Sequence, residues 1–203
     1  RSFRWRSSSL TMALNMNGGM IRLPWKSEIR SQKSEIGDYF LIVSTLADYK
    51  RIDIAIEACN RRGLPLKIVG EGPEHTRLKK IAGSSIEFLG YKDHDALMPL
   101  YQRARALIVP GEEDFGLTPL EAMSQGCPII AYKKGGVLET VTEGETGLFF
   151  AQKTADSLGE LLHHFDHLMY SREKCKLSAE KFRESLFVQK INSSIQAMME
   201  RAS

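Results

Sequence analysis

Short apolar runs alternate with helical patterns along most of this chain, and this alternation constrains its fold more than any other feature. Strands that are buried on both faces and joined by helices form parallel sheets. The predicted strands are residues 39–44, 66–69, 86–89, 106–109, 128–131 and 147–150. The sequence therefore predicts an α/β fold, a Rossmann-like doubly wound parallel sheet of about six strands between about residues 38 and 150.

Capping and breaking residues mark the helices between these strands. Asp93 is a preferred N-cap, Pro73 and Pro119 suit a first helical turn, and Gly63 and Gly126 suit helix ends. The predicted helices cover residues 52–63, 73–82, 93–103, 119–126 and 137–141, followed by two amphipathic helices over 156–170 and 172–201. We expect two regions, an N-terminal leader over 1–37 and one domain over 38–203.

Composition narrows the class of protein. The 203 residues are 42% hydrophobic and 26% charged, which is ordinary for a globular domain, and no apolar run approaches the ~18 residues of a membrane span. The net charge is +3, but residues 1–37 carry seven Lys and Arg against two acids, so the remainder is slightly acidic at −2. A slightly acidic body argues against a nucleic-acid partner.

The basic leader leaves several interpretations open. It is rich in Arg and Ser and lacks an apolar core long enough for a secretory signal. We favour a disordered leader or the boundary of a fragment, with a transit peptide or a contact with an anionic membrane as alternatives. The expected location is the cytoplasm, with a peripheral position at the inner face of the membrane as the alternative.

Cysteine and histidine spacing argue against disulfides and metal. Cys59, Cys127 and Cys175 are odd in number and far apart, as expected of buried or idle thiols in a reducing compartment. His163 and His167 have an i, i+4 spacing that suits a metal, but no third ligand stands at motif spacing, so a solvated helix face is favoured. No Ser or Cys lies in a G-x-S-x-G elbow. We expect no metal and no cofactor.

Ligands of doubly wound sheets bind beyond the carboxyl ends of the strands. One loop there, in the stretch GEEDFGLTPLEA, holds Glu113 and Glu121 on either side of the predicted helix start at Phe115, Gly116 and Leu117. Free N–H groups of a helix start bind anions, and carboxylates accept hydrogen bonds from paired hydroxyls. A sugar phosphate therefore fits this stretch. Ordinary helix-start acids, which stabilise the helix dipole, explain the spacing equally well.

Other loops at the same edge offer cations and glycines. Lys50 and Arg51 follow the first strand at a helix start, where cations are unfavourable unless an anion binds, so they are candidates for a diphosphate. Gly70 and Gly72 follow the second strand and are read as a tight turn or as a wall of the site. The pair Gly135-Gly136 is a further turn whose N–H groups could meet a phosphate.

Four blocks in this chain resemble, in order and spacing, the E-x7-E region and preceding blocks of retaining GT-B glycosyltransferases that use nucleotide sugars. The blocks are FLIVSTLADYKRIDIAIEACN, KIVGEGPE, IEFLGYKDHDALMPLYQRARALIVP and the stretch from Gly111 to Phe150. The sequences of these blocks look most like those of a mannosyltransferase-like subgroup. The resemblance covers about residues 39–150 and implies one half of a GT-B fold, the half that binds the donor.

The resemblance implies roles for the matched residues. Glu113 would contact the donor sugar hydroxyls and Glu121 the ribose, while backbone amides at Phe115–Leu117 hold sugar and phosphate oxygens. Arg51, with Lys50 beside it, falls where a diphosphate-binding lysine usually lies. Base contacts are implied near 88–92, and the donor-binding residues implied there and at the other strand ends are Thr45, Gly70, Gly72, Phe88, Gly90 and Tyr91. The implied reaction is retaining hexosyl transfer from a GDP- or UDP-hexose, with mannose as one candidate sugar, and without metal.

Two departures from the family pattern leave alternatives open. Thr45 stands where the family usually has Arg, and Lys50 would have to compensate. The family also has a second, N-terminal acceptor-binding domain, so a missing domain or a partner subunit is implied and the isolated chain is expected to be inactive. The alternative function is a non-catalytic nucleotide-sugar-binding or regulatory module with the same fold.

Overall fold

The structure is a computed structural model that describes residues 12–14, 20–22, 37–114 and 116–202. The chain divides into two units, Arg1–Glu35 and Ile36–Ser203. In the first unit, β1 (Met12–Leu14) and β2 (Met20–Arg22) form an antiparallel pair. Most of the leader predicted over residues 1–37 lies outside the described residues.

The second unit contains a six-stranded sheet in which every pairing is parallel. The strand order is β5-β4-β3-β6-β7-β8. The strands are β3 (Phe40–Val43), β4 (Leu66–Val69), β5 (Ile86–Gly90), β6 (Leu107–Val109), β7 (Ile129–Tyr132) and β8 (Gly147–Phe150). The chain runs outward from β3 to β5, returns to the centre at β6 and then runs outward the other way. This confirms the predicted Rossmann-like fold and places its switch point between β3 and β6.

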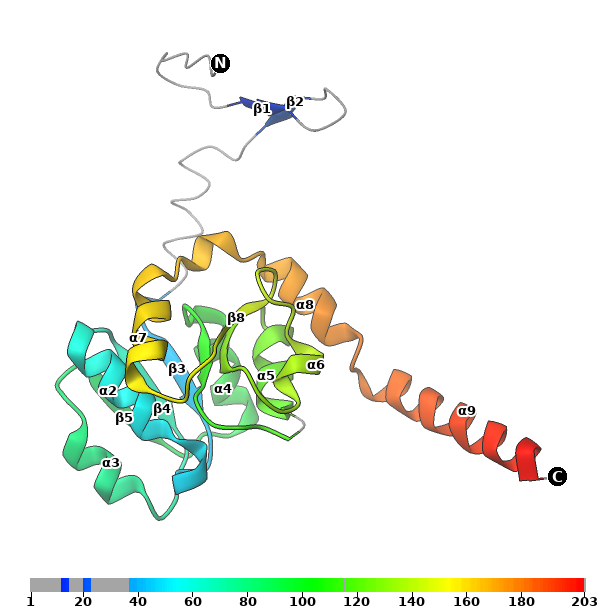
Figure 1. The fold of residues 1–203 in the computed structure, drawn as a ribbon, viewed down its shortest axis with the longest axis horizontal. Coiled ribbons are helices and arrows are strands. Elements are labelled where there is room, and N and C mark those ends of the chain that lie inside the picture. The colour runs from blue at the N-terminus through cyan, green and yellow to red at the C-terminus, as the bar shows by residue number, and fades with distance from the viewer. Residues whose placement is uncertain (1–11, 15–19, 23–36, 115, 203) are drawn as a thin grey trace. The chain divides into compact units, whose positions relative to one another are not determined.

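Alternating side chains divide the core into two layers. Phe40 and Ile42 of β3 pack on one face, and Leu41 between them packs on the other. The first face is covered by α2 (Ile52–Arg62), α3 (His75–Ile81) and α7 (Ala155–His164). The second is covered by α4 (His94–Arg103), α5 (Leu117–Ser124), α6 (Val137–Thr140) and α8 (Arg172–Glu180). Figure 1 shows the two groups of helices on opposite sides of the strands.

The predicted helix start was right at Asp93, too late at Pro119 and too early at Pro73. Asp93 caps α4 by accepting from the Ala96 N–H. Helix α5 begins at Leu117, two residues before Pro119, because a proline is tolerated anywhere in the first turn, where N–H groups have no partner within the helix. Helix α3 begins at His75 rather than Pro73, which lies in the preceding turn.

The two long C-terminal helices predicted from periodicity are wrong in their bounds. The chain forms α7, the short helix η2 (His167–Met169), α8 and α9 (Glu184–Ala202) instead. Asp166 explains one break, because its side chain accepts from the Leu168 N–H and starts η2. Along α9 the apolar side chains Val188, Ile191, Ile195 and Met198 are exposed. Within the described residues, no helix combines the length and hydropathy needed to cross a bilayer.

Candidate functional site

A pocket lies at the switch point of the sheet, beyond the carboxyl ends of β3 and β6. This is where ligands of doubly wound sheets bind. Its lining combines the strand ends with the loops that follow them and the start of α5, and includes Ser44, Lys50, Gly111, Glu113, Thr118 and Pro119. Lys50 and Glu113, two of the residues singled out from the sequence, therefore share one pocket although they lie 63 positions apart.

An ion pair joins these two residues. The Lys50 ammonium donates to Glu113 Oε2 at 2.8 Å, and the side chains are 17% and 27% exposed. A pair in such a partly closed setting is screened less by salt than a surface pair. The pocket thus carries one cation and one carboxylate within hydrogen-bonding reach of each other, and both remain accessible from solvent.

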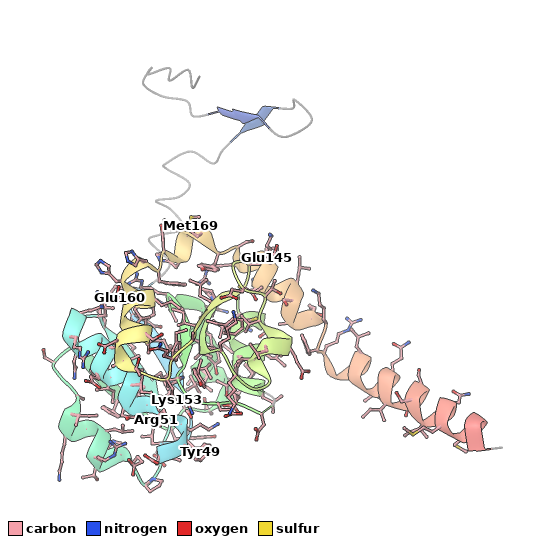
Figure 2. All side chains as sticks on the ribbon, in the orientation of Figure 1. Tyr49, Arg51, Glu145, Lys153, Glu160 and Met169 are labelled. Atoms are coloured by element: carbon pink, nitrogen blue, oxygen red, sulfur yellow. The ribbon has the colours of Figure 1, made fainter. Side chains whose placement is uncertain are left out.

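A short helix positions Lys50. Residues Asp48–Lys50 form the 3-10 helix η1, and the chain before it is anchored by Leu46, whose side chain is fully buried. Gly111 lets the loop after β6 approach this helix, since a Cβ there would stand 2.8 Å from the carbonyl oxygens of both Tyr49 and Lys50. Figure 2 shows Tyr49 and Arg51 at the lower edge of the domain, opposite Met169.

Arg51 is held differently from its neighbour. It adopts a left-handed backbone conformation with φ 53°, and no other non-glycine residue of the described chain has a positive φ. Its guanidinium donates to both carboxylate oxygens of Asp53, each at 3.2 Å. The two residues predicted as a pair of diphosphate cations are thus separated: Lys50 faces the pocket, and Arg51 is bound to Asp53.

The glycines after β4 serve close packing of two loops. A Cβ on Gly70 would lie 1.9 Å from the Ser44 carbonyl oxygen, and one on Gly72 would lie 2.4 Å from that of Leu46. Both residues have positive φ. They therefore allow the loop after β4 to lie against the loop after β3, where Thr45 is exposed and Ser44 lines the pocket.

A second loop contact fixes Glu113. The Gly136 N–H donates to the Glu113 carbonyl oxygen at 2.7 Å, and Glu113 forms a β-bridge with Gly135. Gly135 has φ 83°, and a Cβ on it would lie 2.3 Å from that same oxygen. The Gly136 N–H is therefore engaged by the protein, which argues against the phosphate contact considered for it.

The start of α5 opens toward this region. Gly116 is the N-cap residue in a left-handed conformation with φ 81°, and Leu117, the first helical residue, is 65% exposed. Glu113 lies close by, since its Cγ would be 3.7 Å from a Cβ on Gly116. Phe115, also predicted to contribute its backbone, lies outside the described residues. A helix start in this setting suits an anion.

Glu121 lies on α5 and is engaged from the next helix. The Tyr101 hydroxyl donates to Glu121 Oε2 at 3.3 Å, and Tyr101 is fully buried. Burial, followed by the nearby Glu121 charge, raises the pKa of Tyr101, so the phenol stays protonated and donates. Glu121 does not line the pocket that holds Lys50 and Glu113.

The residues predicted near the base lie around the end of β5. Tyr91 is 70% exposed just beyond that strand, and Gly90 has φ 67°. Phe88 instead packs against the core and makes an edge contact with His75, with ring centroids 5.4 Å apart. Tyr91 is therefore available to a ligand, whereas the Phe88 side chain serves packing.

The thiols are structural. Cys59, Cys127 and Cys175 are free and buried, as predicted, and burial raises their thiol pKa values to about 12, 12 and 11. Among the described residues, His, Cys, Asp and Glu do not gather in a group of three or more suited to a metal ion.

Sequence reasoning missed several roles at this site. Gly111 and Gly135 hold the two loops that carry the ion pair, although Gly135 was considered only for a phosphate contact, and Tyr101 holds Glu121. Thr118 and Ser44 add hydroxyl-bearing residues to the pocket lining. The positions of the two glycines at strand ends were the available signal, whereas the buried tyrosine resembles any other residue of a helix core.

Comparison with known proteins identifies the family. Residues 25–182 match the family described as Glycosyl transferases group 1. The match extends beyond residues 39–150 on both sides and covers most of the chain. The chain therefore belongs to the glycosyl transferases group 1 family.

Individual relatives agree with this assignment. An uncharacterised glycosyltransferase of Methanocaldococcus jannaschii is 30% identical over 131 residues, covering 61% of this chain and 37% of that protein. The human alpha-1,3/1,6-mannosyltransferase ALG2 is 27% identical over 159 residues, covering 70% and 37%. The chain thus spans less than half the length of these curated relatives.

Solved structures share the fold. HepE from Anabaena in complex with UDP superimposes with a TM-score of 0.66 at 20% identity, covering 84% of this chain and 52% of that one. The same protein has also been solved with UDP-glucose. At this identity the likeness shows the fold alone, which is one half of a GT-B glycosyltransferase.

Proposed function

We propose that this chain is the donor-binding domain of a retaining glycosyltransferase, which binds a nucleoside diphosphate hexose and presents it for transfer to an acceptor. The observation that carries the proposal is the Lys50–Glu113 ion pair in a pocket at the switch point of the sheet. Family membership and a fold shared with a protein solved with UDP and UDP-glucose support it.

The site offers each part of such a donor a chemically matched group. The Lys50 ammonium neutralises diphosphate oxygens, together with the N-terminal N–H groups of α5. The Glu113 carboxylate accepts hydrogen bonds from sugar hydroxyls, and Glu121 accepts those of the ribose. Tyr91, exposed beyond β5, provides a face for the base.

These groups also suit the departure of the nucleoside diphosphate. Negative charge grows on the leaving diphosphate as the sugar–oxygen bond breaks, and a preorganised cation and helix start stabilise that charge. We propose that this electrostatic stabilisation acts without a metal. The sugar is proposed to be a hexose carried by UDP or GDP, with mannose as a candidate because ALG2 is a mannosyltransferase.

Calorimetric titration of the 203-residue chain with UDP, GDP, UDP-glucose and GDP-mannose tests the donor role. We expect saturable binding of at least one nucleotide, and its affinity to fall about tenfold or more in Lys50→Met, which removes a charge-assisted contact. A chain that stays folded but binds none of the four at millimolar concentration would contradict the proposal.

A non-catalytic binding module remains the second candidate, because Thr45 stands in the loop after β3 where the resemblance implies a diphosphate-binding Arg. Binding alone does not separate the two. Sugar transfer to an acceptor panel, measured with this chain alone and with this chain joined to an acceptor-binding domain, separates them. Transfer with retained anomeric configuration, read by NMR of the product, supports the enzyme.

A further inference from the structure

We propose that the Lys50–Glu113 ion pair makes this site select the sugar-bearing donor over the bare nucleoside diphosphate, which is the product left after transfer. The inference rests on the proposed function. It adds that the two charged groups are coupled, so that diphosphate and sugar are recognised together rather than as independent parts.

The two charged groups of the site satisfy each other electrostatically. Lys50 and Glu113 bind each other at 2.8 Å with both side chains largely shielded from solvent. The backbone of Glu113 is anchored independently through the Gly136 N–H, and η1, which ends at Lys50, packs on Gly111. Both side chains thus extend from braced loops into one pocket, and a ligand must compete with their mutual contact.

A bare diphosphate can replace only one side of this contact. Its oxygens can accept hydrogen bonds from the Lys50 ammonium, but they offer Glu113 no hydrogen-bond donor. The carboxylate would then lose its cation in a partly closed pocket and face the negative diphosphate, and both changes oppose binding.

A sugar-bearing donor replaces both sides. Its diphosphate accepts hydrogen bonds from Lys50, and its sugar hydroxyls donate to the Glu113 carboxylate, so neither side chain is left without a partner. The site then discriminates by the hydrogen bonds that remain unmade with the wrong ligand. After transfer the sugar is gone, and re-formation of the ion pair favours release of the nucleoside diphosphate.

The neighbouring acid supplies a matched control. Glu112 pairs with Lys134 at 2.9 Å, but their side chains are 40% and 60% exposed, and neither lines the pocket. Replacing Glu112 or Glu113 by Gln changes the net charge of the same loop by the same amount. Only the Glu113 change frees the pocket ammonium.

The experiment compares dissociation constants for UDP and UDP-glucose, and for GDP and GDP-mannose, in wild type, Glu113→Gln and Glu112→Gln. We expect Glu113→Gln to bind the bare diphosphate about fivefold more tightly, because Lys50 no longer has to leave a carboxylate. The preference for the sugar-bearing nucleotide should fall by at least the same factor. Glu112→Gln should leave all affinities within about twofold.

A double-mutant cycle with Lys50→Met isolates the coupling. In that background, Glu113→Gln should no longer tighten binding of the bare diphosphate. Glu113→Ala repeats the test with a smaller side chain, in case the amide itself pairs with Lys50.

The outcomes separate the two proposals. Absence of nucleotide binding by the folded wild-type chain overturns the proposed function. Wild-type binding with unchanged or weaker UDP binding in both Glu113 variants overturns the coupling alone. Equal tightening by Glu112→Gln would also overturn it, since the effect would then be general electrostatics.

Discussion

Adjacent residues Lys50 and Arg51 show how one backbone angle separates two cations. The left-handed conformation of Arg51 turns the chain between η1 and α2, so Lys50 reaches Glu113 while Arg51 reaches Asp53. Because a Cβ disfavours this conformation by about 1 kcal/mol or more, the turn itself costs stability. The position is therefore one where glycine fits the backbone better than arginine.

We expect Arg51→Gly to match or exceed wild-type stability by up to about 1 kcal/mol, and to change nucleotide affinity by less than about threefold. Arg51→Ala, which loses the same ion pair but keeps the Cβ, should be about 1 kcal/mol less stable than Arg51→Gly. Urea denaturation and calorimetry measure both. A loss of affinity as large as that of Lys50→Met would show instead that Arg51 leaves Asp53 to bind the diphosphate.

The Tyr101–Glu121 contact leads to a prediction about which part of the ligand is recognised. Glu121→Ala should weaken UDP binding about tenfold, yet leave inorganic pyrophosphate binding nearly unchanged, because the carboxylate is proposed to bind the ribose. Tyr101→Phe should act in the same direction but less strongly, since it removes the hydrogen bond that orients the carboxylate but leaves the carboxylate itself in place. Equal losses for both ligands in Glu121→Ala would contradict the ribose role.

At the scale of elements, each loop of the site is braced by a turn from the neighbouring strand. The turn after β7 holds Glu113, the turn after β4 holds the loop after β3, and Gly111 joins η1 to the loop after β6. In each case a glycine permits backbone to approach backbone. The geometry of the ion pair therefore depends on residues that make no direct contact with a ligand.

Gly135 and Gly144 form a matched pair for testing this bracing. Their φ angles are 83° and 81°, but a Cβ on Gly135 would collide with the Glu113 carbonyl, whereas one on Gly144 would meet nothing within 4 Å. We expect Gly144→Ala to cost about 1 kcal/mol of stability and to leave nucleotide binding intact. Gly135→Ala should cost at least about 2 kcal/mol and weaken nucleotide binding. Equal effects of the two changes on binding would refute the bracing role.

At the scale of the whole domain, the buried thiols couple stability to alkaline pH. Burial raises the pKa values of Cys59, Cys127 and Cys175 from 9.0 to about 12, 12 and 11. The folded domain therefore favours protonated thiols, while the unfolded chain ionises above about pH 9. Their contribution is complete below pH 9 and is lost as pH rises toward the folded pKa values.

We expect the free energy of unfolding to fall between pH 8 and pH 10 by about 1.4 kcal/mol for each thiol, or up to about 4 kcal/mol in all. Urea denaturation at both pH values measures this fall. Cys127→Ala should be less stable at pH 8, because it leaves a cavity, but should lose less on going to pH 10. A pH dependence identical to that of wild type would show that Cys127 does not contribute.

Much of the domain followed from local pattern. Residues 66–69 and 147–150 were predicted as strands with the bounds that the structure shows, and Asp93 was recognised as an N-cap. The C-terminal region was less predictable. The apolar spacing continues through α7 and η2, and again through α8 and α9, so it predicted two long helices. Such spacing does not register the turn at Asp166 or the break between Glu180 and Glu184.

The sequence by itself determined the order of strands and helices, the parallel sheet and the glutamates of the candidate site, because strand burial, helix caps and the spacing of Glu113 and Glu121 are local properties of the chain. The tertiary structure alone decided which groups meet. Lys50 faces Glu113 because β3 and β6 are neighbours at the switch point, and Tyr101 approaches Glu121 because α4 and α5 pack on one face of the sheet. Such contacts depend on the relative positions of distant segments, which no local pattern encodes.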